Sequence, residues 1–428
     1  MNREGRRAWL VVFLMWVAYV LNYMDRQLVF SLFPVLRAEL GLTDSELGWT
    51  GSIFLWVYAL TSPVAGLLGD RFSKQWLVVG SLGLWSAAMA VMGMARSPGH
   101  VLACRAVIGV VEGFFMPSAI ALTAGALPPG LRSRAIGVLS TAQLAGVFLG
   151  GFFGGWMGDA HLWRWAFYAL GLAGMLYAFP LHRLLQGISP PPTAAPSTRL
   201  SAGGTLAALF RVPSYGVLCL VFPAFCFALW LMYSWLPDYF YQKFGLTLSE
   251  AGTAATAFTQ GPALVGLLIG GASADCLYPR LRASRFYLLL VGLVLLAPCL
   301  HLLGRTDSLR VAEASAAGFG FGSGLFVANL MVSSFDVIPR QVQASAVGTL
   351  NLLGGLVSGW AAYLGGAYCR KPGIPTLMSA AAALCAGGAI ILAIVIGAFF
   401  RRDHDRAAGS NGEPAPQEAL GSTGSEGG

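Results

Sequence analysis

The chain has 428 residues, of which 56% are hydrophobic and only 11% are charged, with a formal net charge of +8. This composition excludes an ordinary soluble domain and is typical of a chain with many membrane-spanning helices. The positive charge does not indicate nucleic-acid binding, because the basic residues lie in short connections between apolar segments. The seven cysteines form no CxxC pair and have no ligand-like spacing with histidine, so we expect no metal and no cofactor.

Twelve apolar segments, most of about 20 residues or more, follow one another along the chain. They lie at residues 9–36, 46–69, 76–95, 98–126, 134–157, 163–182, 213–240, 249–273, 285–304, 310–335, 343–367 and 375–400. The longest internal connection contains SPPPTAAPST and divides six segments from six. The sequence therefore predicts an all-α membrane protein. We expect a six-helix bundle over 1–182, a cytoplasmic linker over 183–212, a second bundle over 213–402 and a disordered cytoplasmic tail over 403–428.

The basic residues are distributed unequally between the two sides that this order of segments creates. If the N-terminus is cytoplasmic, most of the 27 Lys and Arg residues fall on that side. Positive charge favours the cytoplasmic face of a membrane. We therefore expect an integral protein of the plasma (cell inner) membrane with both termini in the cytoplasm.

The two halves of the chain repeat weakly. LPPGLRSRAIG at 127–137 aligns with IPRQVQASAVG at 338–348, and Gly109 and Gly113 align in the same register with Gly320 and Gly324. Two parallel six-helix halves are the plan of one large class of secondary transporters, in which one half rocks against the other around a central site. The repeat thus predicts two pseudo-symmetric bundles and alternating access.

Four ionisable residues lie deep within the first and fourth segments: Asp25, Arg26, Arg105 and Glu112. A charge at this depth costs a few kcal/mol or more, so such residues normally face a cavity and pair with one another. Arg105 and Glu112 are seven residues apart and share a helix face. The pattern predicts one four-charge site in the first half. A buried ion network that only sets helix packing is the alternative.

Four short motifs resemble the major facilitator superfamily. They are NYMDR at 22–26, GLLGDRFSK at 66–74, CRAVIGVVEG at 104–113 and WLPDY at 235–239. Within the superfamily they are similar to the anion:cation symporter branch, which includes sugar-acid/proton symporters and vesicular anion transporters. The spinster-type lipid transporters share the first-helix and fourth-helix signatures, so they are the near alternative.

The resemblance implies a role for each deep charge. Asp25 and Glu112 match protonatable acids that couple proton movement to transport. Arg26 and Arg105 match basic residues that attract a substrate anion. When the anion engages an arginine, the acid loses its partner and takes a proton, so that both enter as a nearly neutral load.

Further polar residues match the family's cavity more loosely. The resemblance implies substrate-binding roles for Tyr23, Tyr58, Gln143 and Asn351. For the tyrosines, ordinary packing is an equal explanation. For Gln143 and Asn351, helix–helix hydrogen bonding is an equal explanation. The candidates to face the cavity from the second half are Asn329, Ser333, Ser334 and Gln260. For Trp230 and Tyr233, facing the cavity and simple packing are both open.

The GLLGDRFSK loop resembles the cytoplasmic loop that latches the two halves in this superfamily. The resemblance implies that Asp70, Arg71 and Lys74 form this cytoplasmic gate. Gln75 stands where a second base is common, so we expect a weaker latch. The alternative is that these charges only set the topology.

These features favour a monomeric secondary transporter that moves a small organic anion with protons through the lipid bilayer. A spinster-like carrier of lysolipid or another amphiphile is the alternative, because the apolar second half suits an alkyl chain. A membrane enzyme is disfavoured, because the chain has no G-x-S-x-G, no His/Glu metal motif and no paired intramembrane aspartates. We expect no nucleic-acid partner.

Overall fold

The computed structural model describes residues 3–69, 72–127, 129–186 and 207–410. Within these ranges the chain folds into helices and forms no strand. The twelve long helices are α1 (Arg3–Ser31), α3 (Asp44–Gly69), α4 (Lys74–Met92), α5 (Pro98–Gly125), α6 (Pro129–Asp159), α7 (Trp163–Leu185), α9 (Pro213–Phe244), α10 (Leu248–Leu277), α11 (Ser284–Arg305), α12 (Leu309–Val337), α13 (Gln343–Ala367) and α14 (Ile374–Ala398). The shorter elements are α2 (Phe33–Leu40), η1 (Arg340–Val342), η2 (Cys369–Gly373) and α15 (Phe400–Ser410).

Ten of the long helices in the described ranges have the length and apolar composition needed to cross a membrane, and α3 and α7 complete the set of twelve. Each long helix coincides with one predicted apolar segment. The predicted all-α membrane fold and the order of its twelve segments are therefore confirmed.

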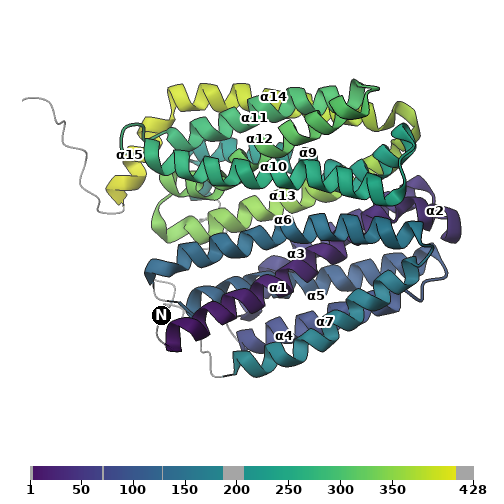
Figure 1. Cartoon of the computed structure of the whole chain (residues 1–428). Coiled ribbons are helices and arrows are strands. Elements are labelled where there is room, and N and C mark those ends of the chain that lie inside the picture. The colour runs from purple at the N-terminus through teal and green to yellow at the C-terminus, as the bar shows by residue number, and fades with distance from the viewer. Residues whose placement is uncertain (1–2, 70–71, 128, 187–206, 411–428) are drawn as a thin grey trace, which may run out of the picture.

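The helices gather into two bundles, which lie one above the other in Figure 1. In the first bundle α1 packs against α6, α3 against α5, and α4 against α7. In the second bundle α10 and α11 pack against α12, and α11 also packs against α14. Two seams join the bundles, one between α3 and α13 and the other between α6 and α10. A third, smaller contact joins α1 to α9.

The start of α1 and the end of α15 lie at the same end of the molecule, on the left of Figure 1, whereas α2 lies at the other end. We call these the terminal end and the distal end. An even number of spans between the two described chain ends explains this placement, because each span reverses the direction of the chain across the membrane.

The predicted first segment, residues 9–36, consists of two helices rather than one. α1 ends at Ser31, and α2 begins at Phe33 with Pro34 in its first turn. Proline has no N–H and clashes with the carbonyl one turn earlier, so it breaks a long helix but fits the start of a new one. Gly41 then ends α2 with a left-handed φ of +66°. Because of this break, Arg37 lies on α2 and not on a continuation of α1.

The prediction of a disordered tail from residue 403 needs correction, because residues 403–410 belong to α15. The ring of Phe400 packs against Phe286 with centroids 5.0 Å apart. Asp403 Oδ2 accepts hydrogen bonds from the backbone N of Ser214 at 3.0 Å and from its Oγ at 2.8 Å. These contacts dock the helix on the second bundle, although the segment is polar overall. The rest of the predicted tail, residues 411–428, and most of the linker lie outside the described residues.

The two bundles approach each other very closely toward the distal end. A Cβ added at Gly151 on α6 would lie 2.7 Å from Thr256 Oγ1 on α10, closer than real Cβ atoms lie. One turn later, Gly155 lies against the backbone of Leu248. Small residues let membrane helices pack at short distance, so this end of the α6–α10 seam is closed.

Candidate functional site

Arg26 and Glu112 form an ion pair deep in the first bundle. Arg26 on α1 is 4% exposed and Glu112 on α5 is fully buried. Arg26 Nε donates to Glu112 Oε2 at 2.9 Å, and Arg26 Nη2 lies 2.8 Å from the same oxygen. Hydrogen bonds between charged groups are stronger than neutral ones, and a low-dielectric surrounding strengthens them further.

Three aromatic rings surround the guanidinium of Arg26. The centroids of Tyr23, Phe54 and Tyr58 lie 4.8, 4.9 and 4.7 Å from its central carbon. Cation–π contacts of this kind gain strength when the cation is removed from water. The structure therefore places two of the predicted substrate residues, Tyr23 and Tyr58, beside Arg26, while their role in binding stays a prediction.

Arg105 is fully buried but forms no ion pair with the described residues. Its Nε donates to the backbone carbonyl of Thr50 at 2.9 Å, and Phe54 lies 4.3 Å from its guanidinium carbon. Among the described residues neither terminal nitrogen of Arg105 has a hydrogen-bond partner. The two terminal N–H groups that bind carboxylates in parallel are thus free to bind another group.

Asp25 is 3% exposed and also has no ion pair within the described ranges. Neighbouring residues on a helix point about 100° apart, so Asp25 cannot share the direction of Arg26. Electrostatic interactions nevertheless link Asp25 to Glu112, Arg105 and Arg26. The four predicted charges do form one cluster, but it contains a single direct ion pair.

Three residues of this cluster were not predicted from the sequence. Asn22 is fully buried, one turn before Arg26, and its side-chain amide interacts with Glu112. The four-residue spacing from Arg26 was the signal that could have identified it. Thr50 and Phe54 come from α3, and an ordinary threonine and phenylalanine carry no such signal.

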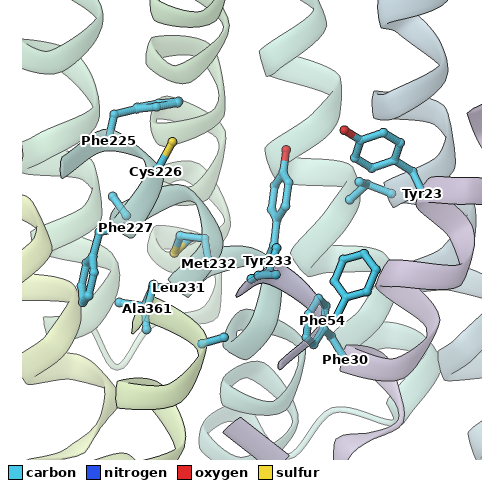
Figure 2. Close-up of a cluster of buried hydrophobic side chains, with 14 of the residues drawn as sticks. Tyr23, Phe30, Phe54, Phe225, Cys226, Phe227, Leu231, Met232, Tyr233 and Ala361 are labelled. Atoms are coloured by element: carbon cyan, nitrogen blue, oxygen red, sulfur yellow. The ribbon is translucent and has the colours of Figure 1, made fainter. Parts of the chain in front are cut away.

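The second bundle contributes Tyr233 and Gln260 opposite this cluster. The hydroxyl of Tyr233 donates to Gln260 Oε1 at 3.3 Å, and Gln143 on α6 interacts with the same hydroxyl. In Figure 2 the rings of Tyr23 and Tyr233 stand near each other, and apolar side chains of α9 lie beyond Tyr233. Gln27 Nε2 donates to the Tyr233 carbonyl at 3.2 Å and ties α1 to α9. Next to this contact, a crevice too narrow to hold a water molecule is lined by Gln27, Met232, Tyr233, Pro237, Ala255, Thr256 and Thr259.

Two other sets of predicted site residues are not joined to the cluster. Asn351 on α13 is exposed, and none of its described contacts reaches the buried charges. Lys74 is half-buried at the start of α4. Asp70 and Arg71 lie outside the described residues. The predicted cytoplasmic gate is therefore still a prediction.

Comparisons with known proteins agree with this architecture. The family model of the Major Facilitator Superfamily matches residues 15–362. The D-galactonate transporter of Escherichia coli is 26% identical over 385 residues, which cover 83% of this chain and 87% of that protein. Protein spinster homolog 1 of Homo sapiens is 30% identical over 250 residues, which cover 55% of this chain and 46% of that protein.

The fold itself matches a solved structure. A bacterial homolog of the human lysosomal transporter spinster superposes with a TM-score of 0.74 at 18% identity, covering 97% of this chain and all of the other. The relatives are transporters, which confirms the prediction that this chain is not an enzyme. On the match over residues 15–362 and the two-bundle fold, the chain belongs to the Major Facilitator Superfamily.

Proposed function

We propose that this transporter carries a small organic anion together with protons, by symport and alternating access. One observation carries the proposal. A buried cluster of two acids and two arginines contains only one ion pair, and both terminal nitrogens of Arg105 have no described hydrogen-bond partner. A carboxylate is the natural ligand for such a guanidinium, because its two oxygens match two parallel N–H groups.

The coupling follows from the charge balance of the cluster. Two ionised acids and two arginines sum to zero, whereas a bound anion adds one negative charge to a buried region. An uncompensated buried charge is costly. The anion competes with Glu112 for Arg26, and a proton on Glu112 or Asp25 restores neutrality. Anion and proton then move together, and release of one favours release of the other.

The substrate space lies between the bundles, with the arginines on one wall. Tyr23 and Tyr58 flank Arg26 on this wall. On the opposite wall, the hydroxyl of Tyr233 interacts with both Gln143 and Gln260. These hydroxyl and amide groups suit a hydroxylated acid. The D-galactonate transporter among the relatives agrees with this substrate class.

The arrangement of the bundles favours a state open at the terminal end. In the described residues, the hydrogen bonds between the bundles lie toward the distal end, as in the contact of Ser52 Oγ with the Gly359 carbonyl at 2.9 Å. Near the terminal end of α6, Arg134, Ile136, Gly137, Val138 and Ser140 are all exposed. These positions cover several faces of one helix, and within 134–140 only the face of Ala135 and Leu139 is buried. We place this end in the cytoplasm of a plasma-membrane monomer, with residues 1–182 and 213–402 as the two moving bodies.

An amphiphile such as a lysolipid is the second candidate. In the described part of the second bundle, α9 presents apolar side chains on the far side of Tyr233 from the charged cluster, including Phe225, Phe227 and Met232 (Figure 2). Among the described residues, the ionisable groups that act on the four buried charges all belong to the first bundle. An alkyl chain could occupy such a wall while its acidic headgroup meets the arginines. Protein spinster homolog 1 among the relatives keeps this candidate relevant.

Uptake into proteoliposomes tests the proposal. Purified protein is reconstituted, and uptake of D-galactonate, a hexuronate, a lysophospholipid and neutral galactose is measured with and without an inward proton gradient. We expect an acid to accumulate only when the gradient is present, and galactose not to be transported. Movement of the lysophospholipid alone would support the second candidate. Equal uptake with and without the gradient would contradict symport.

Chemical labelling tests the proposed orientation. A single cysteine at Ser410, in a variant without the seven native cysteines, should react with an impermeant maleimide only after the membrane is opened. Reaction in intact cells would place the terminal end outside.

A further inference from the structure

An ion network joins the bundles at the distal end. Arg37 on α2 donates from Nη1 to Asp238 Oδ1 at 3.1 Å and from Nη2 to Asp238 Oδ2 at 2.9 Å. Asp238, on α9, is 1% exposed. The third donor of Arg37, Nε, reaches Asp44 Oδ1 at 2.9 Å. Two parallel bonds to one carboxylate give this pair a fixed geometry. A single arginine thus connects α2 and the start of α3 in the first bundle to α9 in the second.

The charge state of this arginine is fixed. Burial alone would lower the pKa of Arg37, but the hydrogen bonds and charge of Asp238, together with Asp44, raise it above its ordinary value. Arg370 adds an exposed contact from the second bundle, with Nε 3.0 Å from Asp44 Oδ2. Because Arg370 is 86% exposed, its pairing contributes little. We call Arg37, Asp44 and Asp238 the α2–α9 clasp.

The α6–α10 seam has a different contact at the same end. Asp159, the last residue of α6, accepts from the backbone N–H groups of Leu248 at 2.9 Å and Ser249 at 2.8 Å. These are the first two residues of α10, whose N–H groups have no partner within their own helix. A carboxylate there also interacts favourably with the helix dipole. The first bundle therefore caps a helix of the second, and we call this contact the α6–α10 clasp.

The capping is divided between the bundles. At the same helix start, Thr247 Oγ1 accepts from Glu250 N at 3.2 Å, and Glu250 Oε2 accepts from Thr247 N at 2.9 Å. These two bonds stay within the second bundle and do not depend on its position relative to the first. Only the bonds of Asp159 must break when the bundles part. Asp159 is exposed, so water can replace those bonds during opening.

We propose that these two clasps, one between α2 and α9 and the other between α6 and α10, together form a gate. This gate holds the distal end shut and sets the balance between the two orientations of the transporter. The inference rests on the alternating-access function proposed above. Apart from the exposed pair of Arg370 with Asp44, the remaining distal bonds between the bundles in the described residues are uncharged, as in the bond from Trp56 Nε1 to the Leu356 carbonyl at 2.9 Å. The clasps therefore supply the charged contacts with a buried or helix-capping carboxylate that must be made and broken in each cycle.

The same helices connect the gate to the charged cluster. Gln27, next to Arg26 in sequence, donates to the Tyr233 carbonyl, and Arg37 binds Asp238 on the same helix, α9. Both contacts join the α1–α2 segment to α9. A displacement that separates Arg37 from Asp238 therefore also moves Gln27 relative to Tyr233, beside the proposed substrate space.

Hydrogen exchange followed by mass spectrometry tests the gate on the complete, detergent-solubilised chain without substrate. Asp238→Asn and Asp159→Ala should each shift the population toward the state open at the distal end by about tenfold, the loss expected for one buried or charged hydrogen-bonded contact. Exchange should rise in the distal segment 248–256. It should fall at the terminal end, in 134–141 and 263–272, because those surfaces close when the distal end opens.

Two variants close to the mutated residues serve as controls. Lys243→Gln changes a charge on α9 close to Asp238, but the described contacts of Lys243 all lie within its own bundle, with Tyr239, Phe244, Thr306 and Asp307. Glu250→Ala removes a cap from the same helix start as Asp159→Ala. We expect local changes at most for both controls, with no protection at the terminal end.

The opposite changes at the two ends are decisive. Faster distal exchange without protection of 134–141 and 263–272 would mean that the clasps only stabilise local structure, and the inference would be wrong. Equal behaviour of Glu250→Ala and Asp159→Ala would also contradict it. Hydrogen exchange reports the conformation without any transport. If the proteoliposome assay contradicts proton–anion symport, the exchange result still tests the gate by itself.

Discussion

Arg26 contacts Glu112 through one carboxylate oxygen only. Nε and Nη2 both lie within 2.9 Å of Oε2, whereas Oε1 has no hydrogen-bond partner in the described residues. This differs from the parallel, two-oxygen pairing of Arg37 with Asp238. A pair bonded through one oxygen lacks the second bond of a parallel pair and leaves a buried acceptor open. The central ion pair is therefore easier to exchange for a substrate than the distal one.

The first prediction concerns the two buried acids. Glu112→Gln and Asp25→Asn keep the side-chain shape but cannot ionise or carry a proton. Each should abolish accumulation of substrate against its gradient while preserving exchange of substrate across the membrane, because a neutral amide resembles the protonated acid. Counterflow and proton-driven uptake in proteoliposomes measure the two activities separately.

Glu313→Gln is the matched control for the acids. Glu313 is a half-buried acid in the first turns of α12, and it forms no ion pair with the described residues. This variant should accumulate substrate normally. If both Glu112→Gln and Asp25→Asn still accumulated substrate, neither acid would be the proton carrier.

The sequence was sufficient to predict the helices and the presence of the charged cluster. A span needs a long apolar run, and a charge within such a run is conspicuous. The sequence could not predict which acid pairs with which base. Asp25 and Arg26 are neighbours, and only the rotation of α1 against α5 decides that Arg26, rather than Arg105, pairs with Glu112.

Other features lacked a distinctive sequence signal. Asp238 lies near the end of a predicted segment, where an exposed charge is common, so nothing identified it as a buried partner of Arg37. The polar composition of residues 403–410 concealed the docking of Asp403 on α9. In both cases the partner is more than 180 positions away along the chain, and no local pattern reports such a contact.

The second prediction concerns Phe54, whose ring lies 4.3 Å from the guanidinium of Arg105 and 4.9 Å from that of Arg26. Phe54→Leu keeps an apolar side chain but removes both cation–π contacts. We expect substrate affinity to fall about fivefold, equivalent to about 1 kcal/mol. Isothermal titration with the substrate found in the uptake screen measures the change.

Phe33→Leu separates this effect from a loss of packing. Phe33 is also fully buried, and its ring packs against Trp235 with centroids 5.0 Å apart rather than against an arginine. Both variants should lose stability, but only Phe54→Leu should lose affinity. A similar loss of affinity in both variants would show that packing, and not the cation–π contacts, supports substrate binding.

The third prediction concerns α15. Asp403→Ala removes the acceptor for the N–H and hydroxyl of Ser214 in the first turn of α9. The loss of a helix cap costs about 1 kcal/mol, so the melting temperature should fall. Asp405→Ala, on the exposed side of the same helix, should leave it unchanged. Equal melting temperatures for wild type and Asp403→Ala would show that α15 does not stabilise the second bundle.

The last prediction concerns Arg105, whose Nε is held by the Thr50 carbonyl while both terminal nitrogens are without a described partner. Arg105→Lys keeps the positive charge but cannot offer two parallel N–H groups to a carboxylate. We expect a loss of substrate affinity of about 30-fold, equivalent to about 2 kcal/mol, and a larger loss for Arg105→Ala. Ligand titration of the purified variants gives these values.

The control for Arg105 is an arginine that serves structure alone. Arg164 Nη1 donates to the carbonyls of Gly93 at 2.9 Å and Ala95 at 2.7 Å, away from the charged cluster. Arg164→Lys should lower the melting temperature and leave affinity intact, whereas Arg105→Lys should lower affinity more than its change in stability explains. Unchanged affinity in both Arg105 variants would exclude Arg105 from the binding site. It would also favour a substrate without a carboxylate, since no other buried arginine in the described ranges has both terminal nitrogens without a described partner.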